Sequence, residues 1–178
     1  MKHKNIILVG MMGSGKTTIG QILLQNLDGF DFFDTDKQIE KAEKQSINKI
    51  FELKGEEYFR KLETKITEDL INSKDLIIST GGGLFVKDEN VQNLKMCGIV
   101  FYLKSSAEEL AKRLENDKSR PLLKNEELTI KLKELLAARE KHYEKADYTI
   151  NTTNKSIEEI TKEIIEKYKK DERTNRQN

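Results

Sequence analysis

One stretch near the start of the chain restricts the possible folds more than any other, because residues 10–17 satisfy the pattern G-x-x-x-x-G-K-[ST]. It directly follows a short hydrophobic run at residues 6–9 and directly precedes an amphipathic helical pattern. Backbone N–H groups must approach a phosphate chain closely, which favours glycine, and the next helix adds the positive end of its dipole. Lys16 can then neutralise the β- and γ-phosphates while the Thr17 hydroxyl holds Mg²⁺. The pattern predicts a nucleotide-binding loop, and the alternative is a glycine-rich turn with an incidental Lys-Thr pair.

The rest of the chain alternates between short apolar runs and longer helical patterns, which is typical of parallel α/β sheets covered on both faces. The expected strands are residues 6–9, 31–33, 75–80, 99–103 and 148–150. The expected helices are residues 16–27, 56–73, 107–116, 126–145 and 157–168, two of them with capping boxes, Ser106 with Glu109 and Ser156 with Glu159. A chain of 178 residues suits a single domain, expected over residues 1–168, and the polar tail at 169–178 is expected to fray.

The composition excludes several classes of protein. With 32 basic and 31 acidic residues the net charge is +1, so no long-range field would gather nucleic acid or an anionic membrane. No apolar run is long enough for a membrane span or a secretory signal. The single cysteine, Cys97, cannot form an internal disulfide. We therefore expect a soluble cytoplasmic protein with no nucleic-acid or membrane partner.

Two carboxylates follow the second expected strand, in the sequence Asp34-Thr35-Asp36. Alternate residues of an extended segment point to the same side, and ligands bind at the carboxyl edge of a parallel sheet. One carboxylate can serve the metal and the other an acceptor hydroxyl. Helix N-capping is the alternative, because Asp is favoured there and residues 37–44 can form a helix.

Arg60 and the run Gly81-Gly82-Gly83 are further candidates for a binding site. Arg60 shares a helix face with Glu63, so an ion pair can fix its guanidinium plane; the alternative is a solvated surface pair. The three glycines end an expected strand at the edge where ligands bind, and close approach of a ligand to the backbone explains them better than a flexible turn.

Two more arginines lie toward the end of the chain. Arg120 precedes the only proline, Pro121, in a loop between helical patterns, where it can swing over phosphates as lid arginines do; the alternative is a solvated loop side chain. Arg139 lies in a helical pattern with no acid three or four positions away. This spacing weakens the interpretation of Arg139 as half of a surface ion pair.

Together these motifs resemble those of the P-loop shikimate kinases in order and spacing, over residues 5–168. The matching motifs are the glycine-rich loop, Asp34-Thr35-Asp36, Phe59-Arg60 with Glu63, Gly81-Gly82-Gly83, Arg120-Pro121-Leu122-Leu123 and Arg139. The resemblance implies a three-layer α/β fold with a five-stranded parallel sheet in the order 2-3-1-4-5, an acceptor-binding region at about 35–61 and a mobile lid at about 117–125. It also implies an enzyme, expected to be a monomer, that transfers the γ-phosphoryl group of ATP to shikimate with Mg²⁺ and yields ADP.

The same resemblance implies a role for each site residue. For the acceptor it implies that Asp36 and Gly82 contact the ring hydroxyls and that Arg60 and Arg139 bind the carboxylate. Gly81 and Gly83 would form the pocket wall, and Phe51 and Phe59 would form an apolar floor. For the nucleotide it implies that Arg120 is the lid cation, that Arg113 lies near adenine, and that Asn151 and Thr152 border the base. The implied phosphate cradle consists of Gly13, Ser14, Gly15, Lys16, Thr17 and Thr18. Thr17 would bind Mg²⁺ directly and Asp34 through water. The implied catalytic residues are Lys16, Asp36 and Arg120, with Asp36 expected to accept the hydroxyl proton.

Alternatives stay open at this point. Arg113 has a surface interpretation, because Glu109 and Asp117 lie four residues from it. Another small-metabolite kinase, such as a gluconate kinase, would also need cations for a carboxylate. A nucleoside monophosphate kinase would need a base pocket that the stretch between the second and third strands does not offer. A nucleotide-binding module without chemistry would leave the acceptor residues unexplained.

Overall fold

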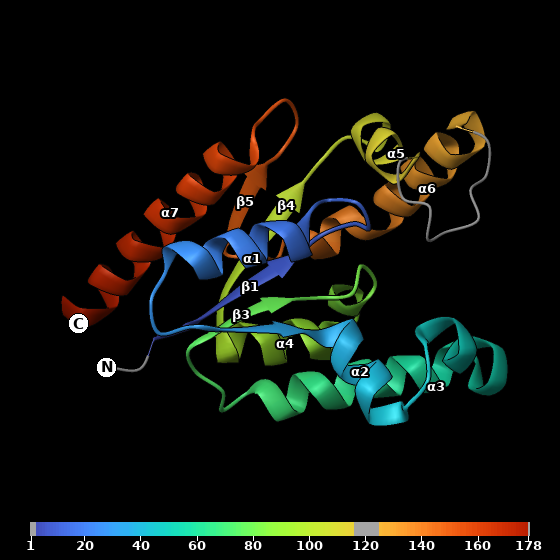
Figure 1. The fold of residues 1–178 in the computed structure, drawn as a ribbon, viewed down its shortest axis with the longest axis horizontal. Coiled ribbons are helices and arrows are strands. Elements are labelled where there is room, and N and C mark those ends of the chain that lie inside the picture. The colour runs from blue at the N-terminus through green and yellow to red at the C-terminus, as the bar shows by residue number, and fades with distance from the viewer. Residues whose placement is uncertain (1–2, 116–124, 178) are drawn as a thin grey trace.

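Five parallel strands form the central sheet of the protein, which we describe from a computed structural model covering residues 3–115 and 125–177 (Figure 1). The strands are β1 (Asn5–Val9), β2 (Asp31–Asp34), β3 (Leu76–Ser79), β4 (Gly98–Lys104) and β5 (Tyr148–Asn151). Their order across the sheet is β2-β3-β1-β4-β5, and every neighbouring pair is parallel. The predicted α/β class and strand order are confirmed, and all the carboxyl ends lie along one edge.

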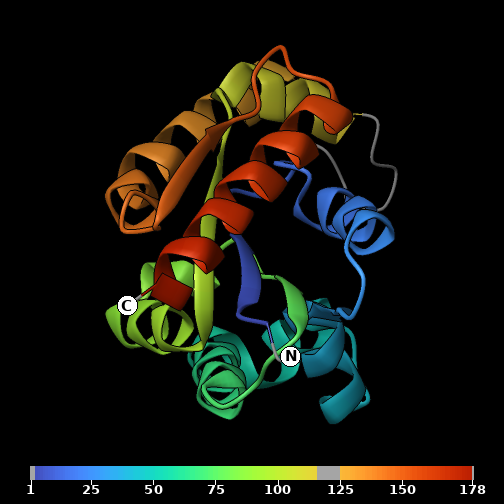
Figure 2. The same ribbon diagram turned by 90° about the vertical axis from the view of Figure 1, so that its left-hand side faces the viewer.

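Helices cover both faces of this sheet and give the molecule three layers (Figures 1 and 2). In the described ranges they are α1 (Lys16–Asn26), α2 (Thr35–Glu43), α3 (Ile47–Leu70), the short 3-10 helix η1 (Leu84–Val86), α4 (Asp88–Cys97), α5 (Ala107–Glu115), α6 (Asn125–Tyr143) and α7 (Ile157–Gln177). Side chains of α1 and α7 pack on one face of the sheet, whereas those of α3, α4 and η1 pack on the other.

The central strand β1 shows why the sheet sits in this register. Ile6 and Leu8 belong to the core under α1 and α7, while Ile7 and Val9 belong to the opposite core. All four side chains are 0% exposed, and burying each one stabilises the fold by about 1.5–3 kcal/mol. Because both faces are apolar, the strand reads as an unbroken hydrophobic run, as expected for a strand covered on both sides.

The segment after β2 forms a smaller compartment beside the sheet. Ile39 of α2 packs against Ile50 and Phe59 of α3, and Phe51 covers this cluster. Helix α3 is broken at Gly55, which has φ 78° and ψ 171°, a conformation that favours glycine. The sequence predicted only the part of α3 after this break, starting at residue 56, because the interruption hides the helical period of the first part.

The helices differ from the predicted ones at two places. Helix α4 was not predicted, and α7 continues to Gln177, past the end predicted at residue 168. Two contacts tie the start of this extension to the body: the Tyr168 hydroxyl donates to the Lys4 carbonyl, and Lys4 pairs with Asp171 at 3.3 Å.

The predicted helix caps are present. The capping box at the start of α7 is complete, with the Glu159 N–H donating to Ser156 Oγ and the Ser156 N–H donating to Glu159 Oε2. At the start of α5 the Glu109 N–H donates to Ser106 Oγ at 3.2 Å. These bonds satisfy N–H groups that have no partner inside the helix.

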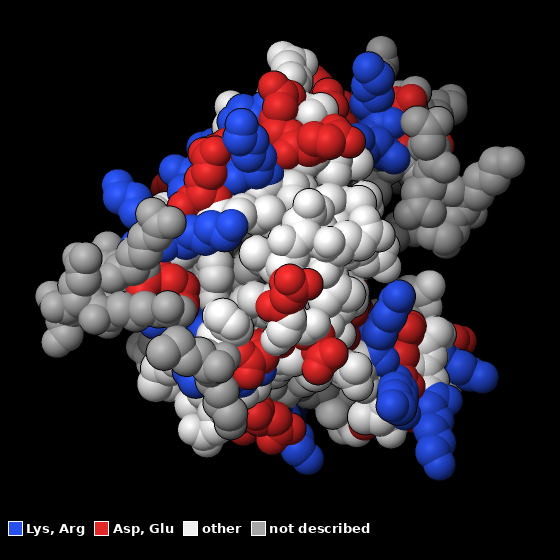
Figure 3. All heavy atoms as spheres, turned by 60° about the vertical axis from the view of Figure 1, so that its left-hand side comes forward, with Lys and Arg blue, Asp and Glu red and all other residues white. Residues whose placement is uncertain are grey.

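The surface agrees with the near-zero net charge. On the face shown in Figure 3, basic and acidic side chains are interspersed and neither sign covers a large area. Among the residues that the structure describes, no helix combines the length and apolar character needed to cross a bilayer.

Candidate active site

The loop between β1 and α1 has the backbone that its glycines predict. Gly13 and Gly15 have φ angles of 79° and 89°, which side chains disfavour, and a Cβ at Gly13 would lie 3.0 Å from Leu114 Cγ. The Lys16 ammonium donates to the carbonyls of Gly10 and Met11 at 2.9 and 2.8 Å, and the residue is only 8% exposed. These bonds hold the cation inside the loop, next to the amino-terminal end of α1 where an anion is favoured.

Oxygen donors from neighbouring strands meet at the end of this loop. The Thr17 hydroxyl donates to Asp34 Oδ2 at 3.2 Å, and Ser79 Oγ lies 3.2 Å from the same hydroxyl. Asp34 also caps α2, because its Oδ1 accepts from the N–H groups of Asp36 and Lys37 at 3.1 Å. Oδ1 therefore confirms the capping interpretation of Asp34, whereas a metal role for Oδ2, which faces Thr17, stays a prediction. Hydroxyl and carboxylate oxygens are hard ligands, so this set suits Mg²⁺ shared with phosphates.

A cleft of about 720 Å³ runs along the carboxyl edge of the sheet. Its walls come from the phosphate loop, the ends of β2 and β3, helix α5 and the start of α7; the lining residues are Met12, Gly13, Ser14, Gly15, Lys16, Thr17, Thr18, Ile19, Asp34, Asp36, Ser79, Thr80, Gly82, Glu109, Arg113, Leu114, Lys155, Ser156, Ile157 and Ile160. The whole predicted phosphate cradle is in this set, together with Asp36, Gly82 and Arg113. Arg60, Arg139 and the two phenylalanines do not line this volume.

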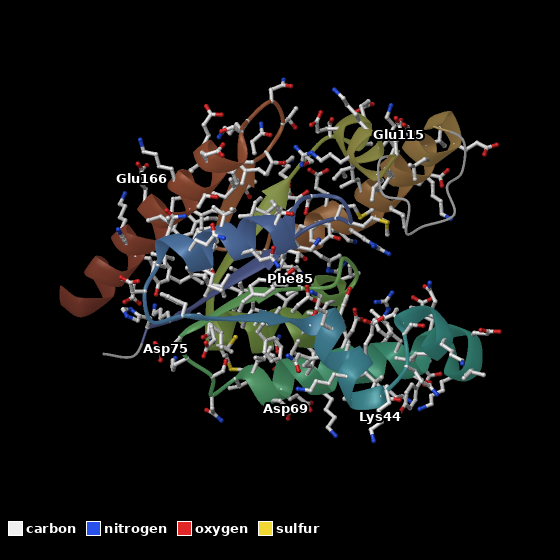
Figure 4. The ribbon with its side chains drawn as sticks, in the orientation of Figure 1. Lys44, Asp69, Asp75, Phe85, Glu115 and Glu166 are labelled. Atoms are coloured by element: carbon white, nitrogen blue, oxygen red, sulfur yellow. The ribbon has the colours of Figure 1, made fainter. Side chains whose placement is uncertain are left out.

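Each of the three successive glycines abuts a different component of the site. A Cβ at Gly81 would lie 2.5 Å from Asp36 Oδ1, and one at Gly83 would lie 2.6 Å from Arg60 Nη1. At Gly82 it would meet the Met12 nitrogen of the phosphate loop at 3.2 Å. The run is held by Leu84 and Phe85, which are 0% exposed; Figure 4 labels Phe85 in the interior. Close packing, against charged side chains at Gly81 and Gly83 and against the backbone of the phosphate loop at Gly82, accounts for these glycines better than a flexible turn.

The pair Arg60 and Glu63 is not a solvated surface pair. Arg60 Nη1 lies 2.6 Å from Glu63 Oε2, and the Glu63 side chain is 1% exposed. A second carboxylate, Glu56, accepts from the other edge of the guanidinium, with its Oε1 2.9 Å from Nη2. Burial raises the pKa of the Glu63 carboxyl; the charges of Arg60 and Arg139 oppose this shift, and the charge of Asp36 adds to it. Asp36, Arg60 and Arg139 therefore all act electrostatically on one buried carboxyl.

Arg139 approaches the same region from helix α6. Its Nη1 lies 3.8 Å from Met11 Sδ in the phosphate loop. Within residues 3–115 and 125–177 no acidic side chain pairs with it within 4 Å, as its helical neighbours predicted. A guanidinium without a protein carboxylate is suited to bind a carboxylate of a ligand.

Phe51 and Phe59 lie together beneath Arg60. Their ring centroids are 4.8 Å apart, and Arg60 Cζ lies 5.6 Å from the centre of the Phe59 ring. Phe59 is only 4% exposed, so it packs mainly in the compartment between α2 and α3. That these rings form the floor of the acceptor site remains a prediction.

The far end of the cleft contains Arg113. Its Nη2 donates to the Thr152 carbonyl at 3.2 Å and pairs with Glu109 at 3.2 Å, so it is held between α5 and the loop after β5. Asn151 and Thr152 do not line the cleft: Asn151 Oδ1 accepts from the Thr153 N–H at 3.0 Å, and Thr152 is 0% exposed. Lys155, Ser156 and Ile157 form that wall instead, and the sequence analysis did not identify them.

Arg120 and the predicted lid, apart from residue 125, lie outside the described residues. Ser79 was also missed, although a detectable signal was present. It lies near the carboxyl end of the strand expected at residues 75–80, at the same edge as Asp34, so the rule that ligands bind at the carboxyl ends of parallel strands would have identified it.

Comparisons with known proteins agree with this geometry. A family model described as shikimate kinase matches residues 12–169, which is most of the chain. The chain belongs to the shikimate kinase family. It is 42% identical over 165 residues to the shikimate kinase of Caldanaerobacter subterraneus subsp. tengcongensis, covering 93% of this chain and 96% of that one. To the enzyme of Persephonella marina it is 46% identical over 162 residues, covering 91% and 97%.

A solved structure shows the same relationship within this family. The shikimate kinase from Acinetobacter baumannii in complex with shikimate is 41% identical and superposes with a TM-score of 0.83, covering 92% of this chain and 91% of that one. The agreement in fold extends over nearly the whole chain. As a member of this family, the chain is an ATP-dependent kinase.

Proposed function

We propose that this chain transfers the γ-phosphoryl group of ATP to the 3-hydroxyl of shikimate, giving shikimate 3-phosphate and ADP. The observation that carries the proposal is the run Gly81-Gly82-Gly83, against which Asp36, the phosphate loop and Arg60 each pack, while Arg139 approaches Met11 of the same loop. Shikimate is a small ring with one carboxylate and three hydroxyls. Two guanidiniums suit the carboxylate, and one aspartate can select a single hydroxyl.

The proposed mechanism relies on positioning and charge. Arg60 and Arg139 would bind the carboxylate and thereby orient the ring, which supplies much of the rate when two reactants are held together. Asp36 would accept the proton of the attacking hydroxyl. The position of Asp36 beside Gly81 supports this role, because a Cβ added at Gly81 would lie 2.5 Å from Asp36 Oδ1. The glycine therefore leaves space for the Asp36 carboxylate next to the proposed shikimate site.

On the nucleotide side, Lys16 and the backbone of the loop would bind the β- and γ-phosphates. Thr17 and Asp34 would hold Mg²⁺, with Ser79 oriented toward the Thr17 hydroxyl. Bound Mg²⁺ would neutralise charge on the phosphates during transfer. We further propose that Arg120, in a lid at about residues 117–125, stabilises the transferred group. The acceptor region at about 35–61, the single domain at 1–168, monomeric state and cytoplasmic location are part of the same proposal.

A coupled assay of ADP release tests this function directly. Wild-type protein is offered ATP and Mg²⁺ with shikimate, gluconate or a nucleoside monophosphate. The proposal expects turnover with shikimate far above the rate with the other acceptors. Good turnover with gluconate and none with shikimate would transfer the assignment to another kinase, and no acceptor-dependent ADP release would favour a non-catalytic nucleotide-binding module.

The variant Arg139→Ala tests the carboxylate contact. Losing a hydrogen bond to a charged group costs about 1.5–3 kcal/mol, so kcat/KM for shikimate is expected to fall roughly 10- to 150-fold while the KM for ATP stays unchanged. Lys141→Ala is the matched control, because it removes an exposed cation from the same end of α6. Unchanged acceptor kinetics in Arg139→Ala would remove Arg139 from the site.

A further inference from the structure

Tyr143 connects parts of the site that the chain brings together from far apart. It is the last residue of α6, one helical turn after Arg139, and its side chain is 0% exposed. Its ring stacks on the ring of Tyr102, with centroids 5.0 Å apart. Its hydroxyl donates to the carbonyl of Gly82 and lies 3.8 Å from Met11 Sδ. The sequence analysis did not identify this tyrosine.

The bond to Gly82 restrains the wall of the acceptor region. A peptide unit is planar and trans, so the direction of the Gly82 carbonyl also sets the direction of the Gly83 N–H, which points the opposite way. Gly83 is the residue whose Cβ would lie 2.6 Å from Arg60 Nη1. Glycines restrict their own backbone less than any other residue, so an external hydrogen bond is an effective way to hold this run in one conformation.

The same hydroxyl also lies beside the second proposed carboxylate ligand. Met11 Sδ is 3.8 Å from both the Tyr143 hydroxyl and Arg139 Nη1, so the two side chains of α6 share one neighbour in the phosphate loop. Residues four apart lie on one face of a helix, which places Arg139 and Tyr143 next to each other. Burial raises the pKa of the Tyr143 hydroxyl, partly offset by the nearby Arg139 and Arg60, so the group stays protonated and able to donate near neutral pH.

We propose that the Tyr143 hydroxyl is a positioning group for the acceptor: it holds the Gly82–Gly83 peptide against Arg60 and keeps Arg139 in register with the phosphate loop. This inference rests on the proposed function, because it assumes that Arg60 and Arg139 bind the acceptor carboxylate. Tyr143 does not line the cleft, so its effect passes through these neighbours and not through contact with the reacting atoms.

The variant Tyr143→Phe removes the hydroxyl and keeps the ring that stacks on Tyr102. The KM for shikimate is expected to rise about tenfold, equivalent to about 1.4 kcal/mol of acceptor binding, while the KM for ATP stays within about twofold of wild type. Tyr102→Phe is the matched control, because it removes the hydroxyl from the other ring of the stack. Tyr102 is also buried, at 1% exposure. This control is expected to leave both KM values unchanged.

Three results would overturn the positioning role. An unchanged KM for shikimate in Tyr143→Phe would show that only the ring matters. An equal rise in the KM values for shikimate and ATP would indicate a general loss of structure. Loss of the cooperative thermal transition in Tyr143→Phe, but not in Tyr102→Phe, would show that the hydroxyl maintains the core. If the wild type itself does not phosphorylate shikimate, the proposed function fails; if it does and Tyr143→Phe matches it, only this inference fails.

Discussion

Adding one methyl group at Gly83 is expected to damage acceptor binding while sparing the nucleotide. The backbone of Gly83 has φ −100° and ψ −10°, which an alanine adopts without strain, so the effect of Gly83→Ala must come from its Cβ. That Cβ would lie 2.6 Å from Arg60 Nη1 and 3.0 Å from Nη2. Since non-bonded atoms do not approach so closely, the guanidinium must move.

The displacement would break the contact that holds the guanidinium in place, and the kinetic effect would come from the hydrogen bond that the displaced guanidinium no longer makes to the acceptor. Arg60 Nη1 lies 2.6 Å from the buried Oε2 of Glu63, and a hydrogen bond to a charged group is worth about 1.5–3 kcal/mol. If the same guanidinium binds the acceptor carboxylate, kcat/KM for shikimate is expected to fall roughly 10- to 150-fold. The KM for ATP should stay within about twofold, because Gly83 does not line the cleft.

Gly82→Ala provides the comparison within the same loop. Its Cβ would meet the Met12 nitrogen of the phosphate loop at 3.2 Å, so this variant, unlike Gly83→Ala, is expected to raise the KM for ATP in addition to the KM for shikimate. Steady-state kinetics with each substrate varied in turn separates the two effects. Wild-type acceptor kinetics in Gly83→Ala, or an equal rise in both KM values, would refute the assignment of Arg60 to the acceptor.

Two further predictions concern single side chains. Asp34→Asn should keep the cap of α2, because Asn caps helices as well as Asp, but should raise the Mg²⁺ concentration needed for half-maximal activity. Asp34→Ala should in addition lower the free energy of unfolding by about 1 kcal/mol in a denaturant titration. Equal Mg²⁺ dependence in the wild type and both variants would contradict the metal role. Burial raises the pKa of the Cys97 thiol from its ordinary value of 9.0 to about 11. Iodoacetamide at pH 8 should therefore alkylate Cys97 only after unfolding, and fast labelling of the native protein would contradict the burial of this thiol. Because the folded state holds this proton more tightly, the contribution of Cys97 to stability is present below pH 9 and is lost as the pH rises toward 11, a component that Cys97→Ala should lack.

The sequence predicted best where local chemistry alone decides the structure. The phosphate loop needs backbone conformations that only glycine adopts easily, so Gly13 and Gly15 are visible without any tertiary information. The central strands β1 and β4 are visible as apolar runs because both of their faces are covered. The strand order is different, because it came from the family resemblance and not from periodicity.

Helix α4 shows where a pattern fails. Its buried face includes Asn90 and Asn93, which are 1% and 7% exposed, so the apolar period is interrupted by polar residues. Both amides have partners inside the protein: Asn90 Nδ2 donates to the Leu84 carbonyl, and Asn93 Nδ2 donates to Thr67 Oγ1. The helical period does not reveal these partners, which lie outside α4: Leu84 is six residues from Asn90, and Thr67 is 26 residues from Asn93. The same limit hid Tyr143, whose acceptor is 61 residues away.

The acceptor site could be predicted only in part for a related reason. The Arg60–Glu63 pair has the spacing of an ordinary surface pair, and only the fold reveals that Glu63 is buried at 1% exposure. Arg113 likewise has a surface partner in Glu109, yet its guanidinium also reaches the Thr152 carbonyl across the cleft wall. Spacing identifies which residues can meet on one helix, whereas burial and contacts between segments depend on the whole fold.

A crystal structure with ADP, Mg²⁺ and shikimate tests the central claim most directly. We predict that the shikimate carboxylate lies within hydrogen-bond distance of the guanidiniums of both Arg60 and Arg139, and that Asp36 contacts the hydroxyl nearest the β-phosphate. A ring bound elsewhere, or one whose carboxylate contacts neither arginine, would contradict the proposed mechanism.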